Sequence, residues 1–168
     1  MFRKPTLPIE TVRMKIFILS FILSDCASTA IVGFSDIDSS CDLCIVAGEL
    51  NGKKTYFLLD TGAGLTTLDK NQCDRYSFSV RERSVMEVGG FTNSVGTVNE
   101  AAGVKSIRIN GIEILEAGVY VTDMDQLVQH IESCTRKRIS GIIGVPVLKR
   151  HKLVIDLSSN KLYKSSAR

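Results

Sequence analysis

The sequence predicts a mostly β fold, in which antiparallel strands close into a small barrel accompanied by one or two short helices. Thirteen glycines against three prolines in 168 residues, with many Val, Ile and Thr, favour strands joined by tight turns. Asn-Gly pairs at 51–52 and 110–111 separate apolar runs, which is the strongest short-range signal of a β-hairpin. Closing such strands into a barrel removes the exposed edges that antiparallel sheets must otherwise protect.

Strands account for most of the chain after residue 41. In order, the expected strand segments are 42–50, 55–60, 65–68, 78–88, 91–101, 104–109, 112–121, 151–157 and 161–163. Residues 69–76 are expected to form a polar turn or one helical turn. Segment 122–134 carries Leu127, Val128 and Ile131 at helical spacing, which predicts a short amphipathic helix. The apolar run 139–148 is expected to be buried and to end in a short helical turn.

The first thirty residues differ from the rest of the chain. A basic start, an apolar stretch from Ile16 to Leu23 and small residues up to Ala30 have the layout of a secretory signal. The apolar stretch is much shorter than the roughly 20 residues that span a bilayer. We therefore expect residues 1–30 to be a signal or hydrophobic leader, and the protein to be exported to the periplasm or envelope. A retained tail that tethers the protein to a membrane, or a lipid on Cys26, are the alternatives.

Residues 31–40 are expected to be a linker, and residues 41–168 one domain long enough to bury a core. The formal net charge is +3, and much of the positive charge lies at the two ends and in the cluster 135–138. No basic stripe alternates with aromatic residues, and there is no Trp. A nucleic-acid partner is therefore not expected, and the cluster is interpreted as a solvated loop.

Four cysteines remain after the leader, at Cys41, Cys44, Cys73 and Cys134. In an oxidising compartment they permit two disulfides, whose pairing the sequence leaves open. A redox Cys-x-x-Cys normally opens a helix, whereas Cys41 and Cys44 lie in a predicted strand, so thiol-disulfide chemistry is a minor alternative. His130 and His151 have no metal-binding partner nearby in the sequence, and no metal or other cofactor is expected.

The segment Tyr56–Leu68, YFLLDTGAGLTTL, ends a predicted strand on Asp60. A carboxylate at the end of a buried strand is costly unless it is paired or used. Gly62 permits a sharp turn and leaves its amide free to donate to a carboxylate, and the Thr61 hydroxyl is expected to lock the loop. Ala63 keeps the surroundings small. This pattern indicates a positioned general base, and a β-turn capped by Asp60 is the alternative.

A second motif lies about eighty residues later, where Ile142-Ile143-Gly144 precedes a short helical turn and a strand. Together with Asp60-Thr61-Gly62, at this separation and in this order, it resembles the retropepsin-like aspartic proteases, especially the single-domain bacterial proteins of the gag-polyprotein type. The likeness spans about residues 42–163. It implies a retropepsin-like fold in which the apolar-apolar-Gly segment packs beside the catalytic loop and supports it.

The resemblance also implies an aspartic endopeptidase that is a homodimer, because this chain holds one Asp-Thr-Gly loop and the chemistry needs two carboxylates. Two copies of Asp60 would face each other, share one proton and activate a water molecule against a peptide bond. The partners expected are a peptide or protein substrate and a second copy of the chain. A flap over the substrate is expected at 86–96, with Gly89 and Gly90 at its tip; an ordinary hairpin turn is the equal alternative.

One departure from the family pattern favours a different function. Gly64 stands where the family usually carries Ser or Thr to brace the catalytic loop. This residue favours a non-catalytic module of the same fold, which binds peptides or acts as a scaffold in the envelope. The alternatives are therefore an active dimeric protease and a protein whose protease site has decayed.

Overall fold

The computed structural model describes residues 31–89, 95–115 and 118–165. The predicted leader at 1–30 lies outside this range. The strands are β1 (Ile31–Asp38), β2 (Ile45–Leu50), β3 (Lys53–Leu59), β4 (Thr66–Asp69), β5 (Ser79–Gly89), β6 (Val95–Ala102), β7 (Ile107–Ile109), β8 (Ile112–Glu113), β9 (Val119–Thr122), β10 (Ile139–Ile143), β11 (Leu153–Asp156) and β12 (Lys161–Ser165). The helices are α1 (Cys73–Tyr76), α2 (Asp125–Thr135) and α3 (Val145–Arg150), with 3-10 turns η1 (Ser40–Asp42) and η2 (Lys70–Gln72).

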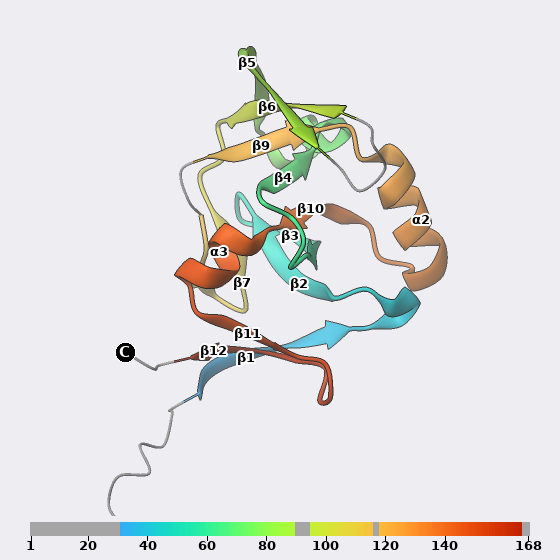
Figure 1. Cartoon of the computed structure of the whole chain (residues 1–168), viewed down its shortest axis with the longest axis vertical. Coiled ribbons are helices and arrows are strands. Elements are labelled where there is room, and N and C mark those ends of the chain that lie inside the picture. Colours follow the sequence, from blue (N-terminus) through green and yellow to red (C-terminus); the bar gives the residue numbers. More distant parts are fainter. Residues whose placement is uncertain (1–30, 90–94, 116–117, 166–168) are drawn as a thin grey trace, which may run out of the picture.

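The strands form one sheet whose hydrogen-bonded order is β11-β12-β1-β2-β3-β10-β4-β9-β6-β5, with β7 and β8 attached to β2. In Figure 1 the β5–β6 hairpin lies at the top, β1, β11 and β12 lie at the bottom, and β3, β10 and β4 run through the centre. The strand before Asp60 therefore lies in the middle of the sheet, far from either end of the strand order. Central strands are held by hydrogen bonds on both sides, which gives the residues that follow them a rigid support.

Two features of the structure bear on the predicted barrel: the relative direction of paired strands, and whether the two ends of the sheet pair. The pairing is mixed, because β10 runs parallel to β3 and β4 runs parallel to β9. The other strand pairs among the described residues are antiparallel, so the expected antiparallel character is confirmed, while both parallel pairs join strands that are distant in the sequence. Within the described residues the strand order is open, as β11 and β5 do not pair with each other. The mostly β class is confirmed, and closure of the barrel stays a prediction.

The structure corrects the prediction that residues 31–40 are a linker. Residues 31–38 form β1, which pairs antiparallel with β12 through Ile31–Asp36 and with β2 through Ile37 and Asp38. Most of this strand pairs with the distant C-terminal strand, which no local sequence pattern indicates. The folded unit therefore includes β1 as well as the predicted domain.

The Asn-Gly prediction is confirmed at both sites. Asn51 and Gly52 join β2 to β3 with φ of 49° and 77°, and Asn110 and Gly111 join β7 to β8 with φ of 47° and 76°. The side chain of Asn51 does more than permit the turn. Its Nδ2 donates to the carbonyl of Tyr76 at 2.8 Å, and its Oδ1 accepts from the Lys105 amide at 2.7 Å. The first hairpin is thus tied to two other parts of the chain.

The segment expected as one strand at 112–121 is divided in two. β8 turns back on β7, whereas β9 leaves it to pair with β4 and β6. The helical content also exceeds the prediction, because three α-helical segments occur among the described residues. The additional one is α1, which with η2 fills the region expected as a turn or one helical turn.

The core has two parts, on the two faces of the central strands. Phe57 and Leu59 of β3 face the larger cluster, with Leu68, Ile143 and Val121. Leu58 faces the other side, where Val128 and Ile131 of α2 cover the sheet together with Ile45 and Ile139. The amphipathic pattern predicted for this helix is thereby confirmed, and burial of its apolar face stabilises the central strands from outside. No helix of the described residues is long and apolar enough to cross a bilayer.

The cysteine pairing left open by the sequence is partly settled by the structure. Cys41 in η1 is bonded to Cys134 in α2, with Cα atoms 6.4 Å apart, while Cys44 and Cys73 are free thiols. Cys41 precedes β2 and adopts a positive φ of 61°, so its placement within a strand was wrong. The bond links the start of the β2–β3 hairpin to the helix that covers its outer face.

We predict that Cys134→Ser lowers the free energy of unfolding by about 2–5 kcal/mol, because the disulfide closes a loop of 93 residues. Urea unfolding of the oxidised proteins measures the effect. Cys73→Ser is the control, since it removes a partly buried sulfur without opening a loop. An equal loss in both variants would show that the disulfide contributes no more than ordinary packing.

Candidate functional site

Asp60 directly follows β3, in the loop that leads to β4. Its backbone amide donates to the carbonyl of Ile143 at 3.1 Å, which continues the parallel β3–β10 pairing by one residue. The Gly62 amide donates to Asp60 Oδ1 at 2.7 Å, and the Ala63 amide donates to the Asp60 carbonyl at 3.3 Å. Both the backbone and one carboxylate oxygen are therefore held. The residue is half-buried, so the carboxylate is fixed and still accessible to solvent.

The predicted support from Ile142-Ile143-Gly144 is found beside this loop. Ile143 is fully buried in the main core, and Ile142 packs on the α2 side. After Gly144 the chain crosses the Asp60 loop, where the Val145 amide donates to the Ala63 carbonyl at 2.8 Å. The two motifs, far apart in the sequence, thus form one hydrogen-bonded unit.

Gly144 is required at this crossing by steric constraint. A Cβ atom there would lie 2.3 Å from the Leu65 carbonyl oxygen and 2.7 Å from that of Ala63. Gly141 is similarly restricted, because a Cβ would lie 2.3 Å from the carbonyl oxygen of Thr67 on β4. Glycine at these positions lets the strands on either side of β10 approach closely.

A hydroxyl does brace the loop, but it belongs to a residue that the sequence reasoning missed. Thr66 Oγ1 accepts a hydrogen bond from the Gly144 amide at 3.2 Å, in a buried position. Thr61, expected to lock the loop, is exposed, and within the described part of this protomer its hydroxyl has no partner. Thr66 lies at the start of a predicted strand, where a buried Thr is a modest signal of such a role.

The other acids do not converge on Asp60. Asp123 is exposed and Asp156 is half-buried. The pKa of Asp123 is lowered mainly because its carboxylate accepts from the Asp125 amide, and the pKa of Asp156 is lowered to about 2 because its carboxylate accepts from the Ser158 and Ser159 hydroxyls. Asp69 was expected to lie in a turn. It is instead fully buried: its carboxylate accepts from Gln72 Nε2 at 3.1 Å and from the Met124 amide, just before α2, at 3.4 Å.

The predicted flap corresponds to the hairpin of β5 and β6, in which Gly89 pairs with Val95. Gly90 lies outside the described residues. The backbone of the hairpin is therefore that of an extended β-ribbon at the top of the molecule, whereas closure over a substrate stays a prediction (Figure 1).

The free thiols show little sign of redox chemistry. Burial raises the pKa of Cys44 and is the main cause of the raised pKa of Cys73. A raised pKa reduces the thiolate fraction, which is the reactive form. Cys41 is bonded to Cys134 rather than to its Cys-x-x-Cys neighbour. Within the described ranges, no three His, Cys, Asp or Glu side chains gather closely enough to hold a metal ion.

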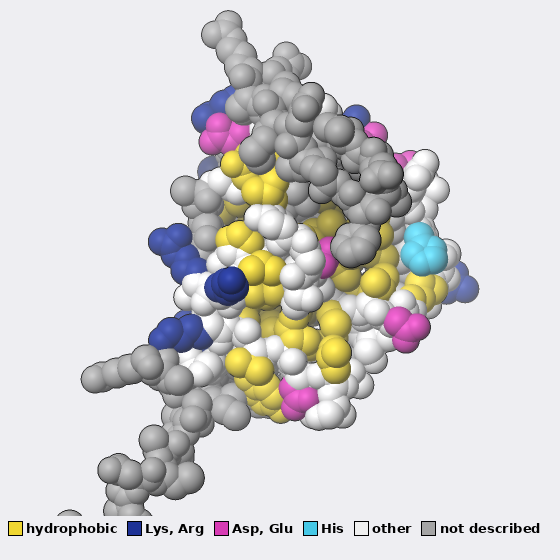
Figure 2. Space-filling view, in the orientation of Figure 1, with side chains coloured by type: hydrophobic (Ala, Val, Ile, Leu, Met, Phe, Trp, Pro, Cys, Tyr) yellow, Lys and Arg dark blue, Asp and Glu magenta, His cyan; other side chains and the backbone are white. Residues whose placement is uncertain are grey.

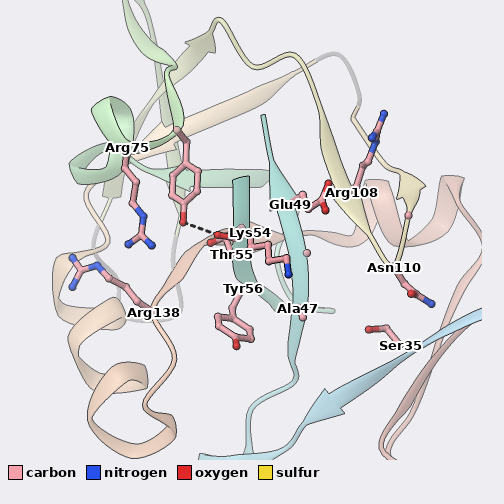
Figure 3. A pocket seen from close by; sticks show the side chains of 13 residues that line it. Ser35, Ala47, Glu49, Lys54, Thr55, Tyr56, Arg75, Arg108, Asn110 and Arg138 are labelled. Carbon is pink, nitrogen blue, oxygen red and sulfur yellow. Dashed lines mark hydrogen bonds between the residues drawn. The ribbon is translucent and has the colours of Figure 1, made fainter. Parts of the chain in front are cut away.

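A cavity of about 520 Å³ lies elsewhere, around the part of β2 and β3 next to their turn. Figure 3 shows the side chains of Arg75 and Arg138 along one side of it, with Lys54 and Tyr56 on β3. Asp60 does not line this cavity. The residues that line the cavity include one carboxylate, Glu49, and several cationic side chains. The cavity therefore offers no pair of acidic groups for the chemistry expected of Asp60.

The comparisons with known proteins agree with the two motifs. The family described as "gag-polyprotein putative aspartyl protease" matches residues 46–150, which is more than half of the chain. The chain belongs to this family. The match includes both Asp60 and the Ile142-Ile143-Gly144 segment, and the retropepsin-like resemblance inferred from the sequence is thereby confirmed.

Two solved structures are similar in fold. The retroviral protease-like domain of Ddi1 from Leishmania major is 22% identical, with a TM-score of 0.46, covering 74% of this chain and 90% of that one. A retropepsin-like aspartic protease from Rickettsia conorii is 17% identical, with a TM-score of 0.49, covering 83% of this chain and 97% of that one. No curated protein matches the sequence.

We predict that Gly144→Ala destabilises the protein by about 1–3 kcal/mol, because the added methyl group overlaps two backbone carbonyls of the Asp60 loop. Gly64→Ala is the matched control, since a Cβ there meets no heavy atom within 4 Å. Unfolding in urea compares the two variants. Equal stability of the two would mean that the crossing tolerates a side chain and that close approach is not what holds the loop.

Proposed function

We propose that the protein is an aspartic endopeptidase whose active site is completed by a second copy of the chain. The observation that carries the proposal is the geometry of Asp60, which is half-buried and held by the Gly62 amide at the end of a central strand. Family membership supports the same chemistry. Within the described residues a single Asp-Thr-Gly loop is present, so the second carboxylate is supplied by the symmetry-related copy.

The reaction follows from the properties of two adjacent carboxyl groups. Carboxylates about 3 Å apart cannot both be ionised, so the pair of Asp60 side chains shares one proton. The ionised member accepts a proton from water, whose oxygen attacks the peptide carbonyl carbon, while the protonated member donates to the carbonyl oxygen. A diol forms. Proton transfer to the amide nitrogen then breaks the carbon–nitrogen bond and releases an acid and an amine.

The side of the protein that carries β11 suits contact with a second copy. β11 is an end strand of the sheet, and the exposed large hydrophobic side chains among the described residues are Val154 in this strand, 48% exposed, and Leu157 just after it, 65% exposed. A largely apolar groove of about 530 Å³ connects β11 with α3 and Thr61, the residue after Asp60. Figure 2 shows hydrophobic side chains gathered across this side of the protein. Joining two such surfaces buries apolar area and places each Asp60 near the interface.

We further propose that the protein works in an exported, oxidising compartment, in the periplasm or attached to the envelope through its leader. The Cys41–Cys134 disulfide supports this location, because such bonds persist where thiols are not kept reduced.

A non-catalytic peptide-binding or scaffold module is the second candidate function. Gly64 favours it, as it removes a hydroxyl expected near the catalytic loop. The hydrogen bond from the Gly144 amide to Thr66 weakens this argument, because a buried hydroxyl two residues later in the chain still braces the loop.

Asp60→Asn is expected to abolish peptide cleavage, by about a thousandfold or more, because an amide cannot accept the proton of the attacking water. Cleavage of a mixed peptide pool by the purified protein, at several pH values, measures the effect. Asp74→Asn, at an exposed carboxylate in α1, is the control and should retain full activity. Equal activity of wild type and the Asp60→Asn variant would overturn the protease function.

Leu157→Glu is expected to weaken dimerisation at least tenfold, because two carboxylates would enter an apolar interface. Analytical ultracentrifugation gives the dissociation constant, and activity should fall in parallel with the dimer fraction. Ala47→Glu, at an exposed position of β2, is the control. Full activity in a variant shown to be monomeric would contradict a shared active site.

A further inference from the structure

The cavity of about 520 Å³ next to the β2–β3 turn is separate from the site at Asp60. It is lined by Lys54, Thr55 and Tyr56 of β3, whereas Asp60 follows the opposite end of this strand. At about 3.3 Å per residue, Lys54 and Asp60 lie about 20 Å apart along the extended chain. Ligand pockets commonly have volumes of about 300–1,000 Å³, a range that includes this cavity. A ligand bound here would therefore have a role distinct from the chemistry proposed for Asp60.

The cavity opens at an edge of β3 that has no strand partner among the described residues. The pairing of β10 with β3 begins at Ile139 and Tyr56, so the residues of β3 before Tyr56 pair with β2 alone. The Tyr76 hydroxyl donates to the Lys54 carbonyl at 3.5 Å near this edge (Figure 3). Because no strand covers the edge, side chains from both faces of β3, such as Lys54 and Thr55, line one cavity.

Thr55 supplies a buried hydroxyl that the protein itself leaves without a partner. The residue is 6% exposed, and its Oγ1 forms no hydrogen bond with any described residue. Figure 3 shows Thr55 on the side of β3 that faces Arg75. A buried hydroxyl without a partner is costly, because it has given up its hydrogen bonds to water. An oxygen atom of a ligand in the cavity would accept the missing hydrogen bond.

The charged side chains that line the cavity are mostly cationic. They are Lys54, Arg75, Arg108 and Arg138, with Glu49 as the single carboxylate among the lining residues. Salt bridges to glutamates outside the cavity compensate the charges of Arg108 and Arg138. Lys54 and Arg75 form no ion pair within the described ranges, and Arg75 lies over the Tyr76 ring, 5.4 Å from its centre. Two positive charges are therefore available to an anion.

The shapes of the lining groups indicate what kind of anion fits. Arg75 and Arg138 lie along the same side of the cavity (Figure 3). A guanidinium group is planar and donates two parallel hydrogen bonds to a phosphate or a carboxylate. Tyr56 adds an aromatic side chain to the lining. An anionic group attached to a planar body would match both the cations and this ring.

We propose that this cavity binds a small organic anion, whose phosphate or carboxylate group accepts hydrogen bonds from the Thr55 hydroxyl and from Arg75. Lys54 adds positive charge to the same cavity, and Tyr56 contacts the planar part of the ligand. The proposal does not depend on the protease function, because none of these residues belongs to the Asp60 loop. It also gives a role to the one buried hydroxyl of β3 that the folded chain does not use.

Phenyl phosphate and benzoate are the probes, titrated into the full-length protein at low salt by isothermal titration calorimetry. At least one of them should saturate a single site per chain, and the affinity should fall as sodium chloride is added. The tighter of the two identifies the anionic group as phosphate or carboxylate. Inorganic phosphate should bind more weakly than phenyl phosphate, and equal affinity would overturn the contact with Tyr56. Absence of saturable binding by both probes would overturn the site.

Thr55→Val replaces the unpartnered hydroxyl with a methyl group. Without a ligand, this variant should be at least as stable as wild type in thermal unfolding, because no hydrogen bond of the folded chain is lost. Its affinity for the tighter probe should fall about tenfold or more, because a hydrogen bond to a charged group is removed. Lower stability in the absence of ligand, together with unchanged affinity, would assign the hydroxyl to folding and contradict the proposal.

Arg75→Gln should also weaken binding about tenfold or more. Lys149→Gln is the matched control, since it removes one positive charge from an exposed position of α3 that does not line the cavity. An equal loss of affinity in both variants would show a general effect of surface charge and overturn the site. Asp60→Asn should bind the probe as wild type does, which separates this result from any failure of the protease function. Circular dichroism verifies that each variant folds.

Discussion

The structure depends on a close crossing between two backbone segments, one leaving β3 and one leaving β10. The parallel pairing of these strands brings Ile143 beside Asp60, and the chain beyond Gly144 then passes within hydrogen-bond distance of Ala63. A side chain at residue 144 would overlap the carbonyls of the loop. This steric constraint, together with the bonds it permits, holds the only Asp-Thr-Gly carboxylate of the chain in a defined place.

The two sides of the protein around Asp60 differ in how they are covered. On one side, α2 covers the central strands and is fastened by the Cys41–Cys134 disulfide and by the buried Asp69 carboxylate. On the other side, α3 and β11 leave an apolar groove that reaches Thr61. The covered side supplies rigidity. The uncovered side offers a surface for a second copy, which the proposed chemistry needs because one carboxylate cannot serve as both base and acid.

The hydroxyl that braces the crossing comes from residue 66 and not from residue 64. Thr66 at the start of β4 accepts from the Gly144 amide in a buried position, whereas a Cβ atom at Gly64 would meet no heavy atom within 4 Å. The absence of a hydroxyl at residue 64 is therefore compatible with a braced loop. The departure from the family pattern at residue 64 therefore leaves the support of Asp60 in place, because that support comes from Thr66.

Local sequence patterns were sufficient to predict the Asn-Gly hairpins, the amphipathic helix, and the two motifs around Asp60 and Gly144. These depend on backbone conformation and periodicity, which neighbouring residues control. The pairing of distant strands became known only from the folded protein, since β1 forms against β12 and the parallel partner of β3 lies about eighty residues away. The brace at Thr66, the burial of Asp69 and the Cys41–Cys134 pair escaped prediction for the same reason. Each depends on contacts whose partners are far apart in the chain, and no local pattern encodes them.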